Sequence, residues 1–465
     1  MISFLFAFLI ALFLYGGSLD YYFFQDDFFE INISQATSLK EYLSFFKFRD
    51  DIIAYRPISL QNYFFISQHI FGLNPVGFRT ITLLLFLLSG FLIYEVTTRI
   101  FKSSKTGLIA SFLWLTSSIH FMSIAWIAAA YNIIGTFFWL LTAFMFFKFI
   151  ETQKLLFFVL TFLSFLITVG SYEFSVTWPA IFGFYYFFVL KNSFLKSIKL
   201  FSPFIIISSV YVILRLLFIK VPQITEYTTT FNLESVKALF WYILWTFNIP
   251  EEFKKQVINN LIVFNPKFFY EYWPLVLKSF LSALLIILLI GTFPFIRASA
   301  NPSFKAGKPL IFLLFWFIAG IFPVLIVPNH TFSMYLTLAS IGLYGCIAYL
   351  LSKTTNTLSL TVLSIWLFSS FTTLSFYKIN SWMVETQKTA KKFSQEVKMQ
   401  FPYLPPNAVI LYPLNAKFEK QALLENHAIR TIYNDPTLTI YYNKEALIKD
   451  ASSLRGKSVY IHIPE

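Results

Sequence analysis

Residues 20–59 read DYYFFQDDFFEINISQATSLKEYLSFFKFRDDIIAYRPIS and form the first long polar segment after an apolar start. The segment carries the acidic pairs Asp26-Asp27 and Asp50-Asp51, followed by the triplet Tyr55-Arg56-Pro57. Neighbouring carboxylates beside a membrane are costly unless they are exposed, paired or used. This polar segment is therefore a candidate functional site, and the apolar sequence around it sets the fold class.

The composition is that of a polytopic membrane protein. Of the 465 residues, 57% are hydrophobic and only 13% are charged, whereas a soluble domain is about 45–50% apolar and about a quarter charged. The net charge of +13 does not indicate nucleic acid, because many Lys and Arg residues lie in short turns between apolar spans. The single cysteine, Cys346, lies in an apolar run and excludes a disulfide framework within the chain.

Apolar windows long enough to cross a bilayer recur along the chain. They fall at 2–18, 78–98, 107–124, 126–147, 155–171, 174–190, 200–219, 274–296, 309–327, 332–351 and 359–377. They predict about eleven transmembrane helices. The first window lacks a basic start and a clean cleavage site, so we interpret it as a retained span.

The connections between these windows sort by charge. One alternate set is basic and contains Arg99, Lys102, Lys105, Lys148, Lys154, Lys191, Lys196, Lys199, Arg297, Lys305, Lys308 and Lys353. The other short turns, near 120–131, 170–177 and 327–333, contain no Lys or Arg. By the positive-inside rule the basic set is cytoplasmic. The N-terminus is then cytoplasmic, and the loops 19–77 and 220–273 and the C-terminal tail are extracytoplasmic.

The chain divides into two parts. Residues 1–380 form a transmembrane domain, and residues 381–465 form an extracytoplasmic tail in which helical and strand-like pieces alternate. Residues 384–400 are expected to be an exposed helix at the start of that tail. The loop 220–273 is rich in aromatic residues, which favours a belt at the headgroup level over a substrate-contacting lid. The predicted fold class is an all-α polytopic membrane protein with a small α/β C-terminal module.

Polar residues from five segments are expected on the outward face. They are Asp26, Asp27, Arg56, Arg79, His120, Tyr131, Asn132, Glu173 and His330. The sequence has no Walker loop, no dinucleotide-binding glycine motif, no CxxC pair and no HExxH. ATP-driven transport, dinucleotide chemistry and zinc proteolysis therefore lack their usual signatures, and no spacing argues for a metal, although divalent metal is not excluded.

Several of these residues lie in motifs that resemble a known group. DDFFEIN, AYRPIS and FGLNPVGF, then His120 six residues before Trp126, then SYEFSVTWPA and MYLTLASIGL follow one another along residues 1–380. Together they resemble the GT-C superfamily of membrane glycosyltransferases. The nearest resemblance is to bacterial relatives of the protein O-mannosyltransferases that carry tetratricopeptide repeats. The resemblance implies sugar transfer from a polyprenyl-phosphate donor on the outward face, with an acid of the first loop as base.

The chain departs from this family at several positions. Arg79 stands where the family usually has a histidine, and Met122, Ala130 and Asn132 stand where it has Glu, Arg and Asp. Tyr172 replaces a lysine, and the tetratricopeptide repeats are absent. These departures make a protein acceptor doubtful and are also compatible with a different sugar or an inactive relative.

The residue types suit this chemistry. Transfer needs a base for the acceptor hydroxyl and cations at the departing phosphate, and arginine meets phosphate oxygens two at a time. We expect Asp26 to be the base, with Asp27 as its support or as an acceptor contact. Arg56 is expected at the phosphate, assisted by Arg79 or His120. Tyr55, Glu173 and His330 complete the predicted substrate-binding set.

Each assignment has a structural alternative. The Asp26-Asp27 pair could cap a loop helix, and Arg56 could pair with Asp50 or Asp51. His120 and His330 could be interface residues, Tyr131 and Asn132 could be packing residues, and Glu173 could be a solvated charge.

The predicted function is a glycosyltransferase of the plasma or inner membrane that needs no cofactor beyond its lipid-linked sugar donor. Its partners would be membrane lipid and an envelope glycan, lipid or exported protein as acceptor, with no nucleic acid. One rival is a transporter or flippase of a lipid-linked glycan, which would place ionisable groups near the bilayer midplane. Another is a non-catalytic membrane scaffold that uses its outward tail to bind a partner.

Overall fold

The computed structural model describes residues 2–49, 52–220, 224–258, 263–300, 307–412, 416–450, 454 and 458–462. Its membrane part consists of α1 (Ile2–Tyr15), α2 (Asp26–Ile33), α3 (Leu39–Ser44), α4 (Tyr63–Phe71), α5 (Pro75–Phe101), α6 (Ser104–Leu115), α7 (Phe121–Ala125), α8 (Tyr131–Thr152), α9 (Leu155–Val169), α10 (Trp178–Phe184), α11 (Phe194–Phe218), α12 (Leu233–Thr246), the antiparallel pair β1 (Val257–Ile258) and β2 (Val263–Phe264), α13 (Pro266–Ala300), α14 (Lys308–Leu325), α15 (Leu336–Ser352) and α16 (Asn356–Asn380). The tail consists of α17 (Trp382–Gln400), β3 (Val409–Leu411), α18 (Lys417–Ala422), α19 (His427–Tyr433), β4 (Thr439–Tyr441), α20 (Lys444–Lys449) and β5 (Val459–Ile461).

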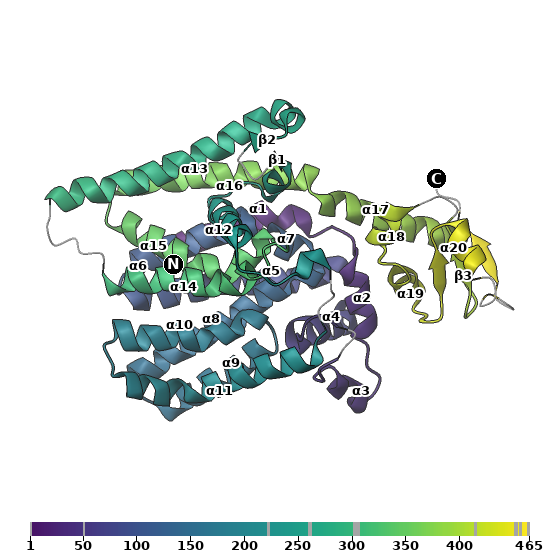
Figure 1. The fold of residues 1–465 in the computed structure, drawn as a ribbon, viewed down its shortest axis with the longest axis horizontal. Coiled ribbons are helices and arrows are strands. Elements are labelled where there is room, and N and C mark those ends of the chain that lie inside the picture. The colour runs from purple at the N-terminus through teal and green to yellow at the C-terminus, as the bar shows by residue number, and fades with distance from the viewer. Residues whose placement is uncertain are drawn as a thin grey trace.

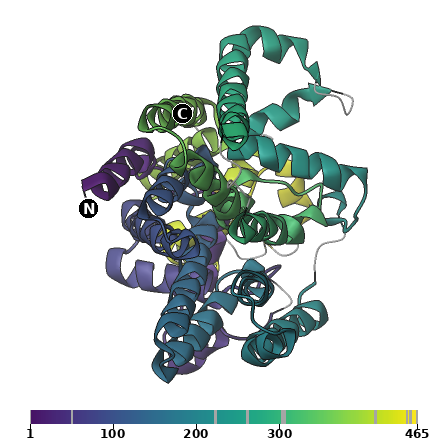
Figure 2. The ribbon, with the colours of Figure 1, turned by 90° about the vertical axis from the view of Figure 1, so that its left-hand side faces the viewer.

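The long helices lie side by side in one bundle, and the tail projects from one end of it (Figure 1). The turns between α5 and α6 and between α8 and α9 and the start of α14 gather at the opposite end, on the left in Figure 1. Viewed from that end, α9 and α11 lie on one side of the central helices and α13 lies on the other (Figure 2). The basic turns therefore share one end of the molecule, and the first loop and the tail share the other.

Local sequence explains where the long helices begin. Asn74 caps α5 by accepting from the Val76 N–H at 3.1 Å, and Pro75 occupies the first turn, where its missing N–H costs nothing. Ser103 and Ser193 cap α6 and α11 through their hydroxyls in the same manner. Between these caps the sequence is apolar on all sides, as expected for helices surrounded by lipid and by other helices.

Among the described residues, seven helical segments are long and apolar enough to cross a membrane, at 75–101, 127–152, 194–218, 266–292, 308–325, 333–352 and 356–400. An eighth is obtained if 104–115 and 118–125, which are bent by 49° to each other, are counted as one span. The prediction of an all-α multi-pass membrane protein is confirmed. Hydropathy windows also counted the shorter apolar helices at 4–18 and 155–169, as well as 174–190, which is divided into short helical pieces.

Small residues allow the central helices to approach closely. A Cβ added at Gly342 of α15 would lie 2.4 Å from the Leu313 carbonyl oxygen and 2.8 Å from the Phe317 nitrogen of α14. Glycine at such a contact lets two backbones meet, which is how membrane helices gain packing energy without a hydrophobic driving force. The helices α14 and α15 are therefore fixed against each other directly behind the candidate site.

The tail folds as the predicted small α/β unit. Its three strands are parallel in the order β4-β3-β5, with Val409 opposite both Thr439 and Val459. The expectation that 384–400 is an exposed helix is wrong for one face of α17. Val384, Phe393 and Val397 are buried there, because the sheet and the other helices of the tail need an apolar face to pack on.

The tail packs against the first outward loop. The Gln25 N–H donates to the Ala422 carbonyl at 2.8 Å, and the Asn32 amide donates to the His427 carbonyl at 3.0 Å. Trp382 forms an edge-to-face contact with Trp126, the ring centroids being 5.5 Å apart. These contacts hold α2 between the tail and the bundle, so the tail helps to position the helix that begins with the acidic pair.

Candidate active site

The acidic pair forms the first turn of α2, where the helix dipole favours negative charge. Gln25, the residue before it, has φ 49° and ψ −125°, a left-handed conformation that side chains other than glycine rarely adopt. Such strain is tolerated only where surrounding contacts fix the backbone, here the hydrogen bond from Gln25 to the tail. The entry into α2 is thus held in one conformation, which points the two carboxylates in different directions.

Asp27 points inward and is fully buried. It accepts hydrogen bonds from the Ala128 N–H at 2.7 Å and the Phe24 N–H at 3.1 Å. Burial raises the pKa of Asp27 to about 7, an effect that the charge of Arg79 and the two N–H groups oppose. Asp27 thus joins the first loop to the turn before α8. Asp27 does not cap α2, as the alternative for the pair proposed, but it has a structural role because it accepts from backbone N–H groups outside that helix.

Arg79 is fully buried as well. Its guanidinium donates to the backbone carbonyls of Leu19, Tyr21, Tyr22 and Ala125. A guanidinium surrounded by protein carbonyls cannot reach a substrate phosphate. We therefore interpret Arg79 as a residue that holds the first loop in place, in contrast to its predicted assistance at the phosphate.

Asp26 differs from its neighbour because its side chain is exposed. The surrounding protein nevertheless removes enough water to raise the pKa of its carboxyl. An accessible carboxyl with a raised pKa has the properties required of a general base. The structure therefore separates the pair into one reactive candidate, Asp26, and one structural residue, Asp27.

Glu30 was not singled out in the sequence, although it belongs to the DDFFEIN motif. It lies one helical turn after Asp26 and is buried, and the amide of Gln61 lies 3.5 Å from its carboxyl. Burial, followed by the charge of Asp26, raises the pKa of Glu30 to about 8, while Arg56 opposes the rise. The i, i+4 spacing from Asp26 was the signal that could have identified it.

Arg56 is held by two partners from distant segments. Its Nε donates to both carboxylate oxygens of Glu173 at 2.9 Å, and its guanidinium lies 3.4 Å from the centre of the Tyr131 ring. The carboxylate of Glu173 more than offsets the effect of burial and raises the pKa of Arg56. Within the described residues the hydrogen bonds to Glu173 use only Nε, so this carboxylate does not occupy the terminal nitrogens. The alternative pairing with Asp50 or Asp51 lies outside the described residues.

Glu173 is a partner of cations rather than a solvated charge. Its side chain is 15% exposed, and a second arginine, Arg215, lies 3.7 Å from its Oε1 atom. Burial alone would raise the pKa of Glu173, but the charges of Arg56 and Arg215 lower it below its ordinary value. Arg215 was missed because it lies near the end of an apolar span, where a single cation is expected to be an orientation signal.

A shallow pocket opens beside Arg56. It is lined by Phe45, Lys47, Arg49, Ile52, Ala54, Tyr55, Arg56, Gln61 and Ile219. Tyr55 stacks on Phe48 with ring centroids 4.1 Å apart, so the tyrosine that was predicted to bind substrate lines this pocket and is held by a second ring. The pocket gathers three cationic side chains, which suits an anionic ligand.

The two predicted histidines have different surroundings. His120 is fully buried between Phe86 and Trp114, with ring centroids 5.1 and 4.3 Å away. It therefore matches the interface reading and does not reach the Arg56 pocket. His330 is half-buried, and burial together with the charge of Arg56 lowers its pKa. Of the two, only His330 lies within electrostatic reach of Arg56.

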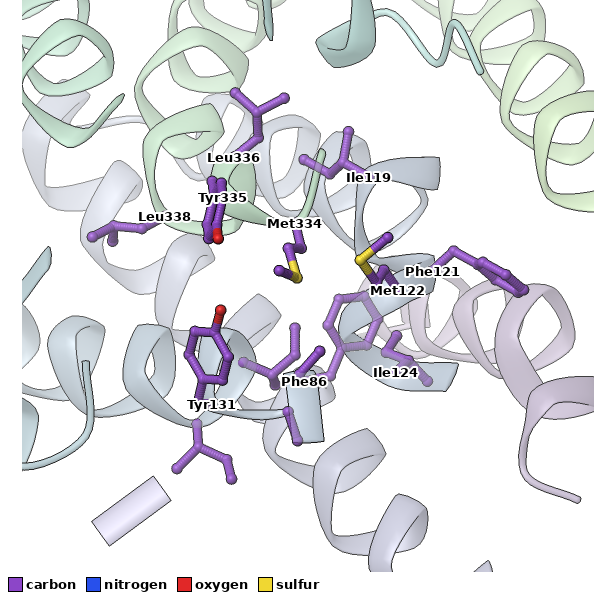
Figure 3. Close-up of a cluster of buried hydrophobic side chains, with 14 of the residues drawn as sticks. Phe86, Ile119, Phe121, Met122, Ile124, Tyr131, Met334, Tyr335, Leu336 and Leu338 are labelled. Carbon is purple, nitrogen blue, oxygen red and sulfur yellow. The ribbon is translucent and has the colours of Figure 1, made fainter. Parts of the chain in front are cut away.

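Tyr131 and Tyr335 complete this region from the bundle side. Their hydroxyl ends point toward one another above a cluster of buried apolar side chains (Figure 3). Tyr131 therefore does more than pack, because its ring face also carries the Arg56 guanidinium. Asn132, by contrast, is buried and bonds the Ala129 carbonyl at 3.0 Å, as its packing alternative predicts.

Metal ligands do not converge in the part of the chain that the structure describes. Among those residues there is no group of three or more His, Cys, Asp or Glu side chains arranged to hold a metal ion. The charged groups that do converge are an exposed carboxylate, a buried glutamate and an oriented arginine. Such a set can move a proton and stabilise an anion.

Comparison with known proteins places the fold. No protein-family model matches the sequence, and no curated protein matches it. ArnT from Cupriavidus metallidurans, solved bound to undecaprenyl phosphate, is 13% identical with a TM-score of 0.50, covering 98% of this chain and 89% of that one. The apo oligosaccharyltransferase of Archaeoglobus fulgidus is 14% identical with a TM-score of 0.49, covering 95% of this chain and 64% of that one. This chain thus spans less than two thirds of the archaeal enzyme.

At such low identity the similarity shows the fold alone, which is the fold that the motifs of residues 1–380 predicted. The narrower resemblance to relatives of the tetratricopeptide-repeat mannosyltransferases stays a prediction. The chain shares the overall fold of ArnT, in agreement with the fold that these motifs predicted.

Proposed function

We propose that the chain is a membrane glycosyltransferase that transfers a monosaccharide from a polyprenyl-phosphate donor to a cell-envelope acceptor on the extracytoplasmic face. The observation that carries the proposal is the pairing of an exposed carboxylate with an oriented guanidinium. Glu30, one turn after Asp26 on α2, lies 3.5 Å from the amide of Gln61, and Gln61 lines the same pocket as Arg56, so the helix that carries Asp26 lies beside the Arg56 pocket. That arrangement supplies the base and the anion-stabilising cation that sugar transfer requires.

Asp26 acts on the acceptor. Its carboxylate takes the proton of the acceptor hydroxyl as the hydroxyl oxygen forms a bond to the anomeric carbon of the sugar. The bond between that carbon and the phosphate oxygen breaks, and its electron pair leaves with the polyprenyl phosphate. General-base assistance of this kind contributes typically about 10²–10⁴-fold to the rate. The raised pKa of Asp26 brings the carboxyl closer to the pH at which it works.

Arg56 acts on the leaving group. Negative charge grows on the phosphate as the bond breaks, and a preorganised guanidinium stabilises it without reorienting. Glu173 and Tyr131 supply that preorganisation by fixing Nε and one face of the guanidinium. The similarity in fold to ArnT, which was solved with undecaprenyl phosphate, supports a polyprenyl phosphate as the lipid.

The location follows from the charge pattern. The basic turns predict a cytoplasmic N-terminus in the plasma or inner membrane, and the candidate site lies at the other end of the bundle with the tail. The donor would therefore be a lipid already presented on the extracytoplasmic side. The acceptor would be an envelope glycan, a lipid or an exported protein.

Complementation of a deletion strain tests the proposal. Mass spectrometry of envelope glycans and lipids should show one sugar missing in the deletion strain and restored by the wild-type chain. Asp26→Asn should not restore it, whereas Glu271→Gln, which removes an exposed charge on α13, should. Restoration by Asp26→Asn would remove this residue from the mechanism. Accumulation of a complete lipid-linked glycan in the deletion strain would instead favour the transporter.

A further inference from the structure

Four aromatic rings lie together beside the candidate site, and no part of the proposed chemistry uses them. Tyr227 contacts His330 with ring centroids 4.7 Å apart, His330 contacts Phe332 at 4.9 Å, and Phe332 and His330 each lie 6.1 Å from Tyr335. We call these four residues the aromatic wall. Tyr227, His330 and Phe332 are only half-buried, so a ligand can reach them.

Two outward loops build the wall jointly. The Thr230 N–H donates to the Ile326 carbonyl at 2.9 Å, and the Asn329 amide donates to the Thr225 carbonyl at 3.1 Å. These bonds tie the segment before α12 to the turn between α14 and α15. Tyr335 then belongs to the short 3-10 helix Ser333–Tyr335, which leads into α15. The wall is therefore attached to the end of the helix bundle that carries the candidate site.

The wall lies beside the phosphate-binding arginine of the site. The hydroxyl of Tyr335 points toward that of Tyr131 (Figure 3), and the centre of the Tyr131 ring lies 3.4 Å from the Arg56 guanidinium. A ligand group next to Arg56 would therefore lie against these aromatic rings.

We propose that the aromatic wall binds the sugar ring of the donor and discriminates against an anionic sugar. A sugar presents an apolar C–H face that can stack on aromatic rings, and ligand sites use such apolar walls with a few polar groups to orient the ligand. The exposed carboxylate of Glu226, adjacent to Tyr227, disfavours an anionic sugar. This inference rests on the proposed function and adds the substrate class.

Binding of two lipids to the purified protein separates this inference from the proposed function. Native mass spectrometry in detergent would compare undecaprenyl phosphate with undecaprenyl-phosphate glucose. Tyr227→Ala and His330→Ala should each weaken binding of the glucose lipid by about tenfold, a typical effect of removing an aromatic anchor. Binding of undecaprenyl phosphate should change less than about twofold, because the phosphate contacts remain. Tyr270→Ala, a tyrosine of α13 that is 86% exposed, is the matched control and should affect neither lipid.

The outcomes are distinguishable. If the wild type binds neither lipid, both the proposed function and the wall are refuted. If the wild type binds both lipids but the variants bind them with equally reduced or unchanged affinity, the wall does not bind the sugar and the proposed function stands. Equal wild-type affinity for the two lipids would also overturn the inference. Arg56→Lys should weaken the binding of both lipids, because both carry the phosphate that Arg56 is proposed to bind.

Discussion

The two neighbouring acids of α2 should respond oppositely to the same substitution, and Asp27→Asn is the decisive change. The Asp27 carboxyl accepts one backbone N–H on each oxygen, from Phe24 at 3.1 Å and from Ala128 at 2.7 Å. An asparagine has the same shape but keeps only one acceptor, so its NH₂ group must face one of these N–H donors. A buried N–H left without a partner costs about 1–3 kcal/mol. We expect Asp27→Asn to destabilise the protein by about that amount.

Asp26→Asn is the matched control because it makes the same chemical change one residue earlier. Among the described residues no such pair of donors faces the exposed Asp26 side chain, so its substitution should change stability by less than about 0.5 kcal/mol. The loss of sugar transfer should be greater in Asp26→Asn than in Asp27→Asn, the opposite of the order expected for stability. Asp26→Asn should retain the fold and lose sugar transfer, whereas Asp27→Asn should lose activity only to the extent that the fold is weakened.

Thermal unfolding in detergent, followed by tryptophan fluorescence, measures the difference. Trp126 lies close to this loop, with its ring stacked on Phe24 at 6.0 Å, and reports on the region that Asp27 holds together. The unfolding midpoint of Asp27→Asn should fall by about 1–3 °C relative to wild type and to Asp26→Asn, because in a chain of this length 1 kcal/mol shifts the midpoint by about 1 °C. Equal midpoints for the two variants would refute the assignment of Asp27 as the structural member of the pair.

Three further predictions concern stability. Glu30→Gln should flatten the pH dependence of the unfolding midpoint. Burial raises the pKa of Glu30 to about 8 in the folded protein, so the stabilisation from the protonated Glu30 carboxyl is complete below about pH 4 and is lost as pH rises through 8. An unchanged pH profile in the variant would contradict this. Gln25→Gly should leave the midpoint unchanged or raise it, because glycine adopts φ 49° without strain, whereas Gln25→Val should lower it; the reverse order would show that the backbone there is relaxed. Gly342→Ala should cost about 1–3 kcal/mol through overpacking against Leu313, and Gly291→Ala, with open space around its Cβ position, is the control that should cost less.

Much of the fold could be predicted because it depends on local sequence. A run of about 20 apolar residues predicts a spanning helix wherever it occurs, and the basic turns give the order of the ends. The bend between α6 and the segment 118–125 could not be predicted in this way. It is stabilised by Trp366, whose indole donates to the Thr116 hydroxyl at 3.1 Å, and by the Ser370 hydroxyl, which donates to the Thr116 carbonyl. These partners lie about 250 positions away in the sequence, so a hydropathy window cannot detect them.

The candidate site shows a similar division between residue type and environment. The sequence identified Asp26, Arg56 and Glu173 from their chemistry and their expected face of the membrane, and the structure brings Arg56 and Glu173 into contact. It could not distinguish Arg56 from Arg79, because both are arginines at the outward ends of apolar segments. The difference lies in their acceptors: four backbone carbonyls surround Arg79, while one carboxylate holds Arg56 by Nε alone among the described residues. Since the carboxylate in the second arrangement does not occupy the terminal nitrogens, the function of an arginine here depends on the neighbours that the fold supplies.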